Sequence, residues 1–219
     1  MTPLLVLHDV GDPGGGGPWR VALEGAGWSG AVHAPDLPGH GATPAPVGGS
    51  YELGDPVLAV LPSVSADADH RPVVLGVGTN GWCASILALG GRASALVLVD
   101  GLGGPFRPQA EAMAAERERI RAIADDPTAV GPAPAGGLDP RLRHGVSPMG
   151  SRAVAERAAA ATSVPVLVLE SPASPVTPEE RDAVAGRYPA GATVVEVESA
   201  DPDAVAPCVV SWISSGRPA

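Results

Sequence analysis

The chain contains no lysine, because all 14 of its basic residues are arginine. Chemistry that needs a lysine amine, such as Schiff-base formation, is therefore excluded. Aromatic residues make up only 3% of the 219 residues. The two cysteines, Cys83 and Cys208, are too few for a disulfide framework and lack the spacing of metal ligands. Both lie in apolar stretches, so we expect two buried free thiols.

Positive charge is scarce as well. The formal net charge is −10, which argues against nucleic acid as a partner and favours a small neutral or cationic molecule. The N-terminal residues carry one short apolar run, too short for a signal peptide or a membrane span. We therefore expect a cytoplasmic protein with no membrane partner.

Six short apolar runs are spaced along the chain, and most lack polar alternation, as strands do when both faces of their sheet are covered. These runs are residues 3–8, 30–35, 72–77, 95–100, 164–169 and 193–198. Helical stretches separate or follow them, at 18–26, 51–62, 80–90, 108–124, 152–162, 177–188 and 201–213. Thr177 begins a capping box, and Asp201 is a predicted N-cap. The alternation predicts an α/β fold with a doubly wound, mainly parallel sheet of about six strands.

One region interrupts this alternation. Residues 101–163 hold a charged helix and then a segment rich in proline and glycine. The region is either a surface linker or a short helical lid over the carboxyl ends of the strands, where such sheets bind ligands. We divide the chain into a core, residues 1–100 and 164–219, and a lid, residues 101–163.

The lid helix carries Met113, Ile120 and Ile123 on roughly one face, which predicts that it docks on an apolar surface at the mouth of a pocket. Residues 125–147 have few apolar side chains with which to anchor themselves by burial. We expect that segment to be the least ordered part of the chain.

Several motifs, in this order and spacing, resemble the α/β-hydrolase superfamily. They are “LLVLHDVG” (4–11), “APDLPGHGAT” (34–43), “LGVGTNGW” (75–82), “ALVLVDG” (95–101) and “VPVLVLESPASPV” (164–176). The resemblance covers most of the chain and implies that fold without its first hairpin. It also implies a nucleophile elbow, the strand–turn–helix that presents the catalytic residue, at 75–82. Cys83 and Cys208 would then lie on opposite faces of the sheet, too far apart to pair.

The elbow has two possible registers. An elbow holds its nucleophile at positive φ and needs small neighbours. With Gly78 at the nucleophile position the neighbours are small, Asn80 among them. With Thr79 there, Val77 and Trp82 stand where small residues are needed, and the threonine itself is strained. We favour Gly78, which carries no nucleophile, and keep Thr79 as the alternative.

The resemblance places the family's catalytic acid in “ESPASPV”, where Ser174 stands, and its histidine in “ESADP”, where Asp201 stands. Together with Gly78, these residues occupy all three positions of a Ser-His-Asp triad without its chemistry. We therefore predict a degenerate triad, and a hydroxyl without a base is a poor nucleophile.

Five chemically capable residues remain near the elbow. The backbone N–H groups of Val10 and Thr79 predict an oxyanion-hole-like pair, which needs no side chain. Asp9 replaces a residue that is normally small in the family; its carboxylate either lies beside this pair, where it disfavours ester hydrolysis, or points to solvent. His8 and Asp100 each end a strand nearby, and each either transfers protons or is structural.

His144, beside Arg141 and Arg143, forms the one basic cluster, which either faces the pocket from the lid or lies on the surface. The glycine-rich stretch 11–17 lacks the lysine of a phosphate loop. We expect no cofactor and no metal site.

Three functions fit these features. The first is a non-hydrolytic enzyme that orients a small apolar or neutral organic ligand for cyclisation, isomerisation or elimination. The second is a pseudoenzyme that binds a ligand or a protein, and the third is a weak esterase using Thr79. The predicted catalytic residues are His8, Asp9, Thr79 and Asp100. The predicted pocket residues are Val10, Gly78, Asn80, Trp82 and His144.

Overall fold

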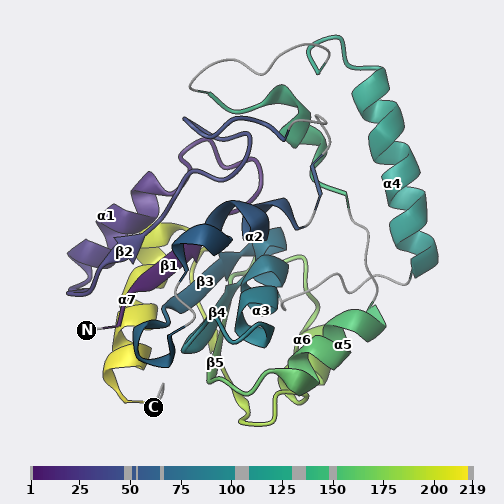
Figure 1. The fold of residues 1–219 in the computed structure, drawn as a ribbon. Coiled ribbons are helices and arrows are strands. Elements are labelled where there is room, and N and C mark those ends of the chain that lie inside the picture. The colour runs from purple at the N-terminus through teal and green to yellow at the C-terminus, as the bar shows by residue number, and fades with distance from the viewer. Residues whose placement is uncertain are drawn as a thin grey trace.

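The computed structural model describes residues 2–46, 51–52, 54–64, 67–101, 109–129, 137–147 and 152–216 (Figure 1). Its centre is a six-stranded parallel sheet with the strand order β2-β1-β3-β4-β5-β6. The strands are β1 (Leu4–Leu7), β2 (Val32–His33), β3 (Val73–Val77), β4 (Ala95–Val99), β5 (Val166–Glu170) and β6 (Ala192–Glu196). The predicted fold class is confirmed.

Helices connect the strands on both faces of the sheet. The α-helices are α1 (Gly17–Gly25), α2 (Asp55–Val60), α3 (Gly81–Leu89), α4 (Gln109–Ala124), α5 (Arg152–Ala161), α6 (Pro178–Ala185) and α7 (Pro202–Ser214). The short 3-10 helices are η1 (Leu61–Ser63), η2 (Ala68–His70), η3 (Gly78–Asn80) and η4 (Pro140–His144). Within the described part of the chain, no helix is both long and apolar enough to cross a membrane.

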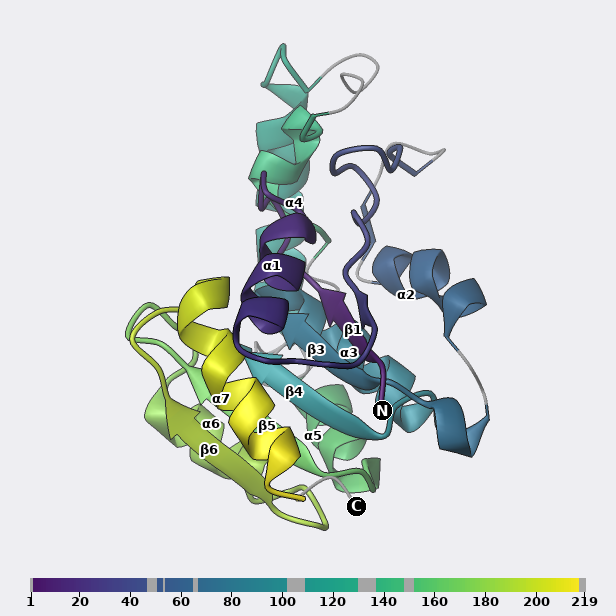
Figure 2. The ribbon, with the colours of Figure 1, turned by 90° about the vertical axis from the view of Figure 1, so that its left-hand side faces the viewer.

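The sheet separates two apolar clusters, which explains why its central strands show no polar alternation. Leu96 and Leu98 of β4 face one cluster, with α2, α3, α5 and α6. Val97 and Val99 face the other, with α1 and α7, which lie together on one side of the molecule (Figure 2). Each of these four side chains is 0% exposed. Full burial of one such side chain contributes about 1.5–3 kcal/mol, so apolar residues are favoured on both faces of the strand.

The strand order places a topological switch point between β1 and β3. The chain leaves β1 through α1 on one face and leaves β3 through α3 on the other. Doubly wound sheets bind their ligands where adjacent connections part in this way. Asp9 follows β1 and Gly78 follows β3, so both lie at this point.

The two predicted caps have different outcomes. The capping box at Thr177 is present, with the Thr177 hydroxyl accepting from the Glu180 N–H at 3.2 Å. Asp201 stands at the N-cap position of α7, but its side chain does not cap the helix. Asp201 instead accepts a hydrogen bond from the Ser199 hydroxyl at 2.8 Å, so the predicted capping bond is wrong.

The two cysteines lie in different apolar clusters and form no disulfide, as predicted. Cys83 is fully buried in α3, and burial raises the pKa of its thiol to about 12. Cys208 is only half-buried in α7, so the prediction of two buried thiols is wrong for this residue.

We expect a thiol reagent to titrate two thiols per chain in denaturant without reductant. In the native protein Cys208 should react first, because Cys83 is shielded and its thiolate is disfavoured. Fewer than two thiols in denaturant would contradict the structure, and a Cys208→Ala variant identifies the faster thiol.

Candidate functional site

The elbow turn is built around Gly78. Gly78 has φ +53°, whereas Thr79 is not among the residues of positive φ. A Cβ on Gly76 would lie 2.6 Å from the Asn80 carbonyl oxygen and 2.8 Å from Gly81 Cα, so β3 and α3 approach too closely for a side chain there. This geometry matches the register with Gly78 at the nucleophile position, for which small neighbours are required.

The carboxylate of Asp9 lies directly over Gly78. A Cβ at Gly78 would overlap Asp9 Oδ1 and lie 2.7 Å from Asp9 Cγ. Oδ1 accepts hydrogen bonds from the Val10 N–H at 2.8 Å and from the Thr79 N–H at 3.3 Å. The two N–H groups predicted as an oxyanion-hole-like pair therefore hold a carboxylate of the chain itself.

The surroundings of Asp9 raise the pKa of its carboxyl above that of an exposed aspartate. Burial raises the pKa of its carboxyl; the N–H groups of Val10 and Thr79 oppose this, and the charges of Asp12 and Asp100 add to it. Oδ2, the second carboxylate oxygen, makes no hydrogen bond to the residues that the structure describes. The Asp9 residue as a whole is half-buried.

His8 is engaged at both ring nitrogens. Nε2 accepts from the Leu37 N–H at 3.2 Å, so Nδ1 carries the proton and donates to the Asp9 carbonyl oxygen at 3.0 Å. The ring is 0% exposed and packs edge-on against His40, with 4.6 Å between ring centroids. Burial lowers the pKa of His8, opposed by its bond to Asp9. In this bonding state the imidazole is neutral and ties the loop after β1 to the loop after β2.

Asp100 directly follows β4 and is 9% exposed. Its Oδ1 accepts from the Ser171 N–H at 2.7 Å and its Oδ2 from the Ser171 hydroxyl at 2.6 Å. The carboxylate therefore ties the end of β4 to the end of β5. In the next residue, Gly101, a Cβ would overlap the Gly78 carbonyl oxygen, so this turn lies against the elbow.

The other predicted site residues fall into two groups. Asn80 lies at the elbow and donates from Nδ2 to the His8 carbonyl oxygen at 2.5 Å, and Trp82 is half-buried on α3. Ser174 accepts from the Val176 N–H at 3.2 Å in the turn after β5. Asp201 is exposed at the start of α7.

No histidine in the described part of the chain hydrogen-bonds the Thr79 hydroxyl, and that part includes all five histidines. His8 and His40 are bonded to loop backbone, and His70 pairs with Asp67. His33 lies exposed on the edge strand β2. The described residues also include no group of three His, Cys, Asp or Glu suited to a metal ion.

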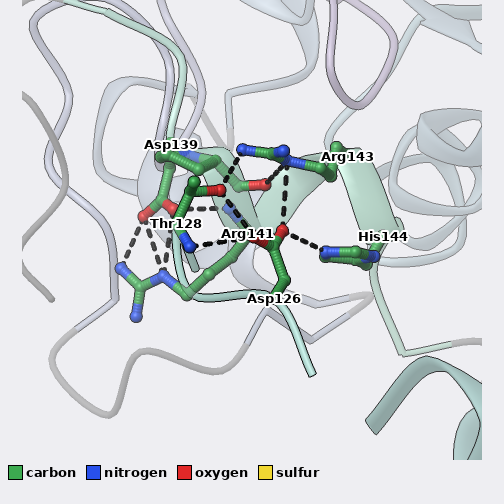
Figure 3. A network of polar contacts seen from close by, with 7 residues as sticks. Asp126, Thr128, Asp139, Arg141, Arg143 and His144 are labelled. Atoms are coloured by element: carbon green, nitrogen blue, oxygen red, sulfur yellow. Dashed lines mark hydrogen bonds and ion pairs between the residues drawn. The ribbon is translucent and has the colours of Figure 1, made fainter. Parts of the chain in front are cut away.

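His144 lies in a separate polar network of the predicted lid, which Figure 3 shows. Its Nε2 is 2.8 Å from Asp126 Oδ2, and Thr128 and Arg143 also contact that carboxylate. Hydrogen bonds from Thr128 and His144 hold the pKa of Asp126 below its usual range. Residues 130–136 of the predicted least ordered segment lie outside the described residues. In the described part of the segment, Ala129 and Leu142 are buried and polar contacts add to them, so the expectation that it cannot anchor itself by burial is wrong there.

The same lid segment is bound to the core through Tyr51. The Tyr51 hydroxyl donates to Asp139 Oδ2 at 2.7 Å, and Arg141 Nε donates to Asp139 Oδ1 at 3.0 Å. The Asp139 N–H bonds the Gly39 carbonyl oxygen at 2.8 Å, and the Ser147 N–H bonds the Tyr51 carbonyl oxygen at 3.0 Å. Residues 139–147 are therefore attached to the loop after β2. Sequence reasoning missed Tyr51 and Asp139, although the Asp-Pro pair at 139–140 is an N-cap signal.

Helix α4, which the sequence division assigns to a lid, stands apart from both helical layers (Figure 1). Ile120, predicted to dock on an apolar surface, is 54% exposed, so that prediction is wrong for this residue. Met113 and Ile123 are half-buried. Helix α5, which the sequence division assigns to the lid region, packs beside α3 in the core layer through buried alanines such as Ala159.

A family model described as “Alpha/beta hydrolase family” matches residues 4–213. The chain belongs to the alpha/beta hydrolase family.

Solved structures share the fold of this alpha/beta hydrolase over nearly its whole length. A hydrolase from Pseudomonas aeruginosa superposes with a TM-score of 0.72 at 20% identity, covering 97% of this chain and 89% of that one. A thermophilic esterase from Thermogutta terrifontis gives a TM-score of 0.71 at 18% identity, covering 99% and 91%. A monoacylglycerol lipase from Paleococcus ferrophilus gives 0.67 at 18%, covering 97% and 94%. A search of the curated proteins found none that matches. At these identities the likeness establishes the fold of this alpha/beta hydrolase and not its substrate.

Proposed function

We propose that this alpha/beta hydrolase is a non-hydrolytic enzyme that uses the Asp9 carboxylate to move a proton on a small neutral organic molecule. One observation carries the proposal. The Asp9 carboxylate occupies the space over Gly78 and both N–H groups beside it, where hydrolysis would need a nucleophile side chain and an empty oxyanion site.

The arrangement of Asp9 suits a general base. Two N–H groups orient Oδ1, which leaves Oδ2 to face a substrate in a fixed geometry. Burial raises the pKa of the carboxyl above the ordinary 3.8, which makes its ionised form a stronger base than an exposed aspartate. Such proton abstraction serves isomerisation, elimination or cyclisation. In this proposal Gly78, Ser174 and Asp201 mark a degenerate triad, and His8 and Asn80 position the loop that carries Asp9.

The test measures proton exchange on small ketones in D2O by NMR. We expect the wild-type protein to accelerate exchange at the carbon next to the carbonyl, and Asp9→Asn to lose about 10²–10⁴-fold of that rate. Asp203→Asn is the matched control, because it removes an exposed carboxylate on α7 that is not among the groups acting on Asp9. Exchange should rise with pH through a pKa above 3.8, since only the ionised carboxylate accepts the proton.

Ester turnover tests the hydrolytic alternative in the same preparations. Turnover of p-nitrophenyl acetate that disappears in Thr79→Ala would contradict the proposal and favour the esterase reading. Proton exchange that survives in Asp9→Asn would also overturn it.

A binding pseudoenzyme is the second candidate, because the N–H pair is already satisfied within the chain and needs no substrate oxygen. A molecule that copurifies with the protein, is seen by native mass spectrometry and is returned unchanged would favour this reading.

A further inference from the structure

Asp100, the residue after β4, has a strained backbone conformation. Its position after a strand does not by itself require that conformation. It is the one non-glycine residue in the described part of the chain with positive φ, +48°. A glycine would adopt this conformation without strain, and aspartate tolerates it only better than most residues. Strain of this kind persists where surrounding contacts over-determine it, and such positions cluster at functional sites.

The Asp100 side chain is held by two hydrogen bonds from Ser171, and its backbone N–H donates to the Leu169 carbonyl oxygen at 2.9 Å. The Ser171 N–H and hydroxyl each bond a different oxygen of the carboxylate, at 2.7 and 2.6 Å. Ser171 is buried, so neither bond competes freely with water. We call these two hydrogen bonds the Ser171 clamp. A glycine at position 100 would relieve the backbone strain but would lose the clamp. The Asp100 carboxylate therefore contributes the link to Ser171.

The strained turn continues directly into the elbow. Gly101 lies so close to the Gly78 carbonyl oxygen that a Cβ would overlap it. That carbonyl and the Thr79 N–H belong to one planar peptide unit, so fixing one end fixes the direction of the other. The Thr79 N–H is the group that donates to Asp9 Oδ1.

We propose that Asp100 is a positioning residue for the Asp9 carboxylate: its clamp on Ser171 holds Gly101 against the Gly78–Thr79 peptide and thereby aims the Thr79 N–H at Asp9. In this proposal Asp100 acts through its two hydrogen bonds from Ser171 and not by exchanging a proton with the substrate. The inference deepens the proposed function, but its test measures the geometry of the elbow and needs no turnover.

The first measurement is amide hydrogen exchange at Thr79. In Asp100→Gly, which keeps the backbone conformation available, we expect exchange at Thr79 to be about tenfold faster or more, because the peptide is no longer held. Ser171→Ala removes one of the two bonds and should give a smaller acceleration. Asp203→Asn, an exposed site on α7, is the control and should leave Thr79 unchanged.

The second measurement is the titration of Asp9, followed by carboxyl ¹³C NMR and assigned with Asp9→Asn. In Ser171→Ala the charge of Asp100 remains while the Thr79 donor is weakened. That donor lowers the pKa of Asp9, so weakening it should raise the pKa further. If the clamp had a purely structural role, the pKa of Asp9 would be the same in Ser171→Ala as in the wild-type protein.

Unchanged Thr79 exchange in both Asp100→Gly and Ser171→Ala would overturn the inference. So would acceleration spread equally over β3 and β4, which indicates general loss of stability. If Asp100→Gly does not fold, Ser171→Ala decides between these outcomes. If the wild-type protein catalyses no proton exchange while Thr79 exchange still depends on Asp100 and Ser171, only the proposed function fails. Failure of the proposed function and failure of this inference are therefore distinguishable.

Discussion

Gly78→Ser should lower the free energy of unfolding by about 2–5 kcal/mol and should create no esterase. The serine must adopt a left-handed backbone, and its Cβ must displace the Asp9 carboxylate that it would overlap. Without a histidine at the elbow the new hydroxyl also has no base. Denaturant unfolding and p-nitrophenyl acetate turnover measure the two effects.

The design separates the backbone cost from the collision with Asp9. Gly191 has φ +75° and open space around it, so Gly191→Ser carries the backbone cost alone. The double variant Asp9→Gly/Gly78→Ser lacks the carboxylate. The stability that it loses relative to Asp9→Gly should equal the stability that Gly191→Ser loses relative to the wild-type protein. A Gly78→Ser cost equal to that of Gly191→Ser, or unchanged in the Asp9→Gly background, would contradict the observed packing.

Asp139→Ala should destabilise the protein by about 2–3 kcal/mol, because it removes the buried carboxylate to which the Arg141 guanidinium and the Tyr51 hydroxyl both donate. Asp139 is 1% exposed, and it binds both groups. Tyr51→Phe removes only the hydroxyl and should cost about 1–2 kcal/mol. Denaturant unfolding measures both, and amide exchange at Ser147, which bonds Tyr51, shows whether the lid detaches first.

The control for this prediction is Asp67→Ala, which breaks an exposed pair with His70 and an N-cap bond from the Asp69 N–H, and should cost much less stability than Asp139→Ala. The contribution of Asp139 also depends on pH. Burial raises the pKa of its carboxyl, but the hydrogen bonds from Arg141 and Tyr51 outweigh this and lower it overall. A lowered pKa in the folded state means that the stabilisation is present at neutral pH and is lost as the pH falls below 3.8 through the lowered value. Equal stability of Asp139→Ala and Asp67→Ala would refute the prediction.

The sequence predicted the sheet well because buried parallel strands leave a local signal. The run at 95–100 is apolar on both faces, and the structure places β4 there with each face in a different cluster. The edge strand was harder, since residues 30–35 contain a strand of only Val32–His33. β2 pairs with β1 at only two positions, whereas the other edge strand, β6, pairs with β5 at five.

The site was less predictable because its contacts join distant parts of the chain. The bond from Tyr51 to Asp139 spans 88 positions, and neither residue alone signals the other. The direction of the Asp9 side chain depends on the missing side chain at Gly78, which a local reading of “HDVG” does not contain. The small residues around the elbow could be predicted from the sequence, because the steric limits that require them act between residues a few positions apart.

The fit between Asp9 and Gly78 also sets an order in which mutations can occur. If serine is introduced at position 78 while Asp9 is present, its Cβ overlaps the Asp9 carboxylate. If Asp9 is first replaced by glycine, that space is empty and two N–H groups lose their acceptor. The effect of one substitution thus changes with the state of the other, which is epistasis between two positions 69 residues apart in sequence. A directed-evolution path toward hydrolysis in this scaffold must begin at position 9, and libraries that vary position 78 alone would be depleted of folded members.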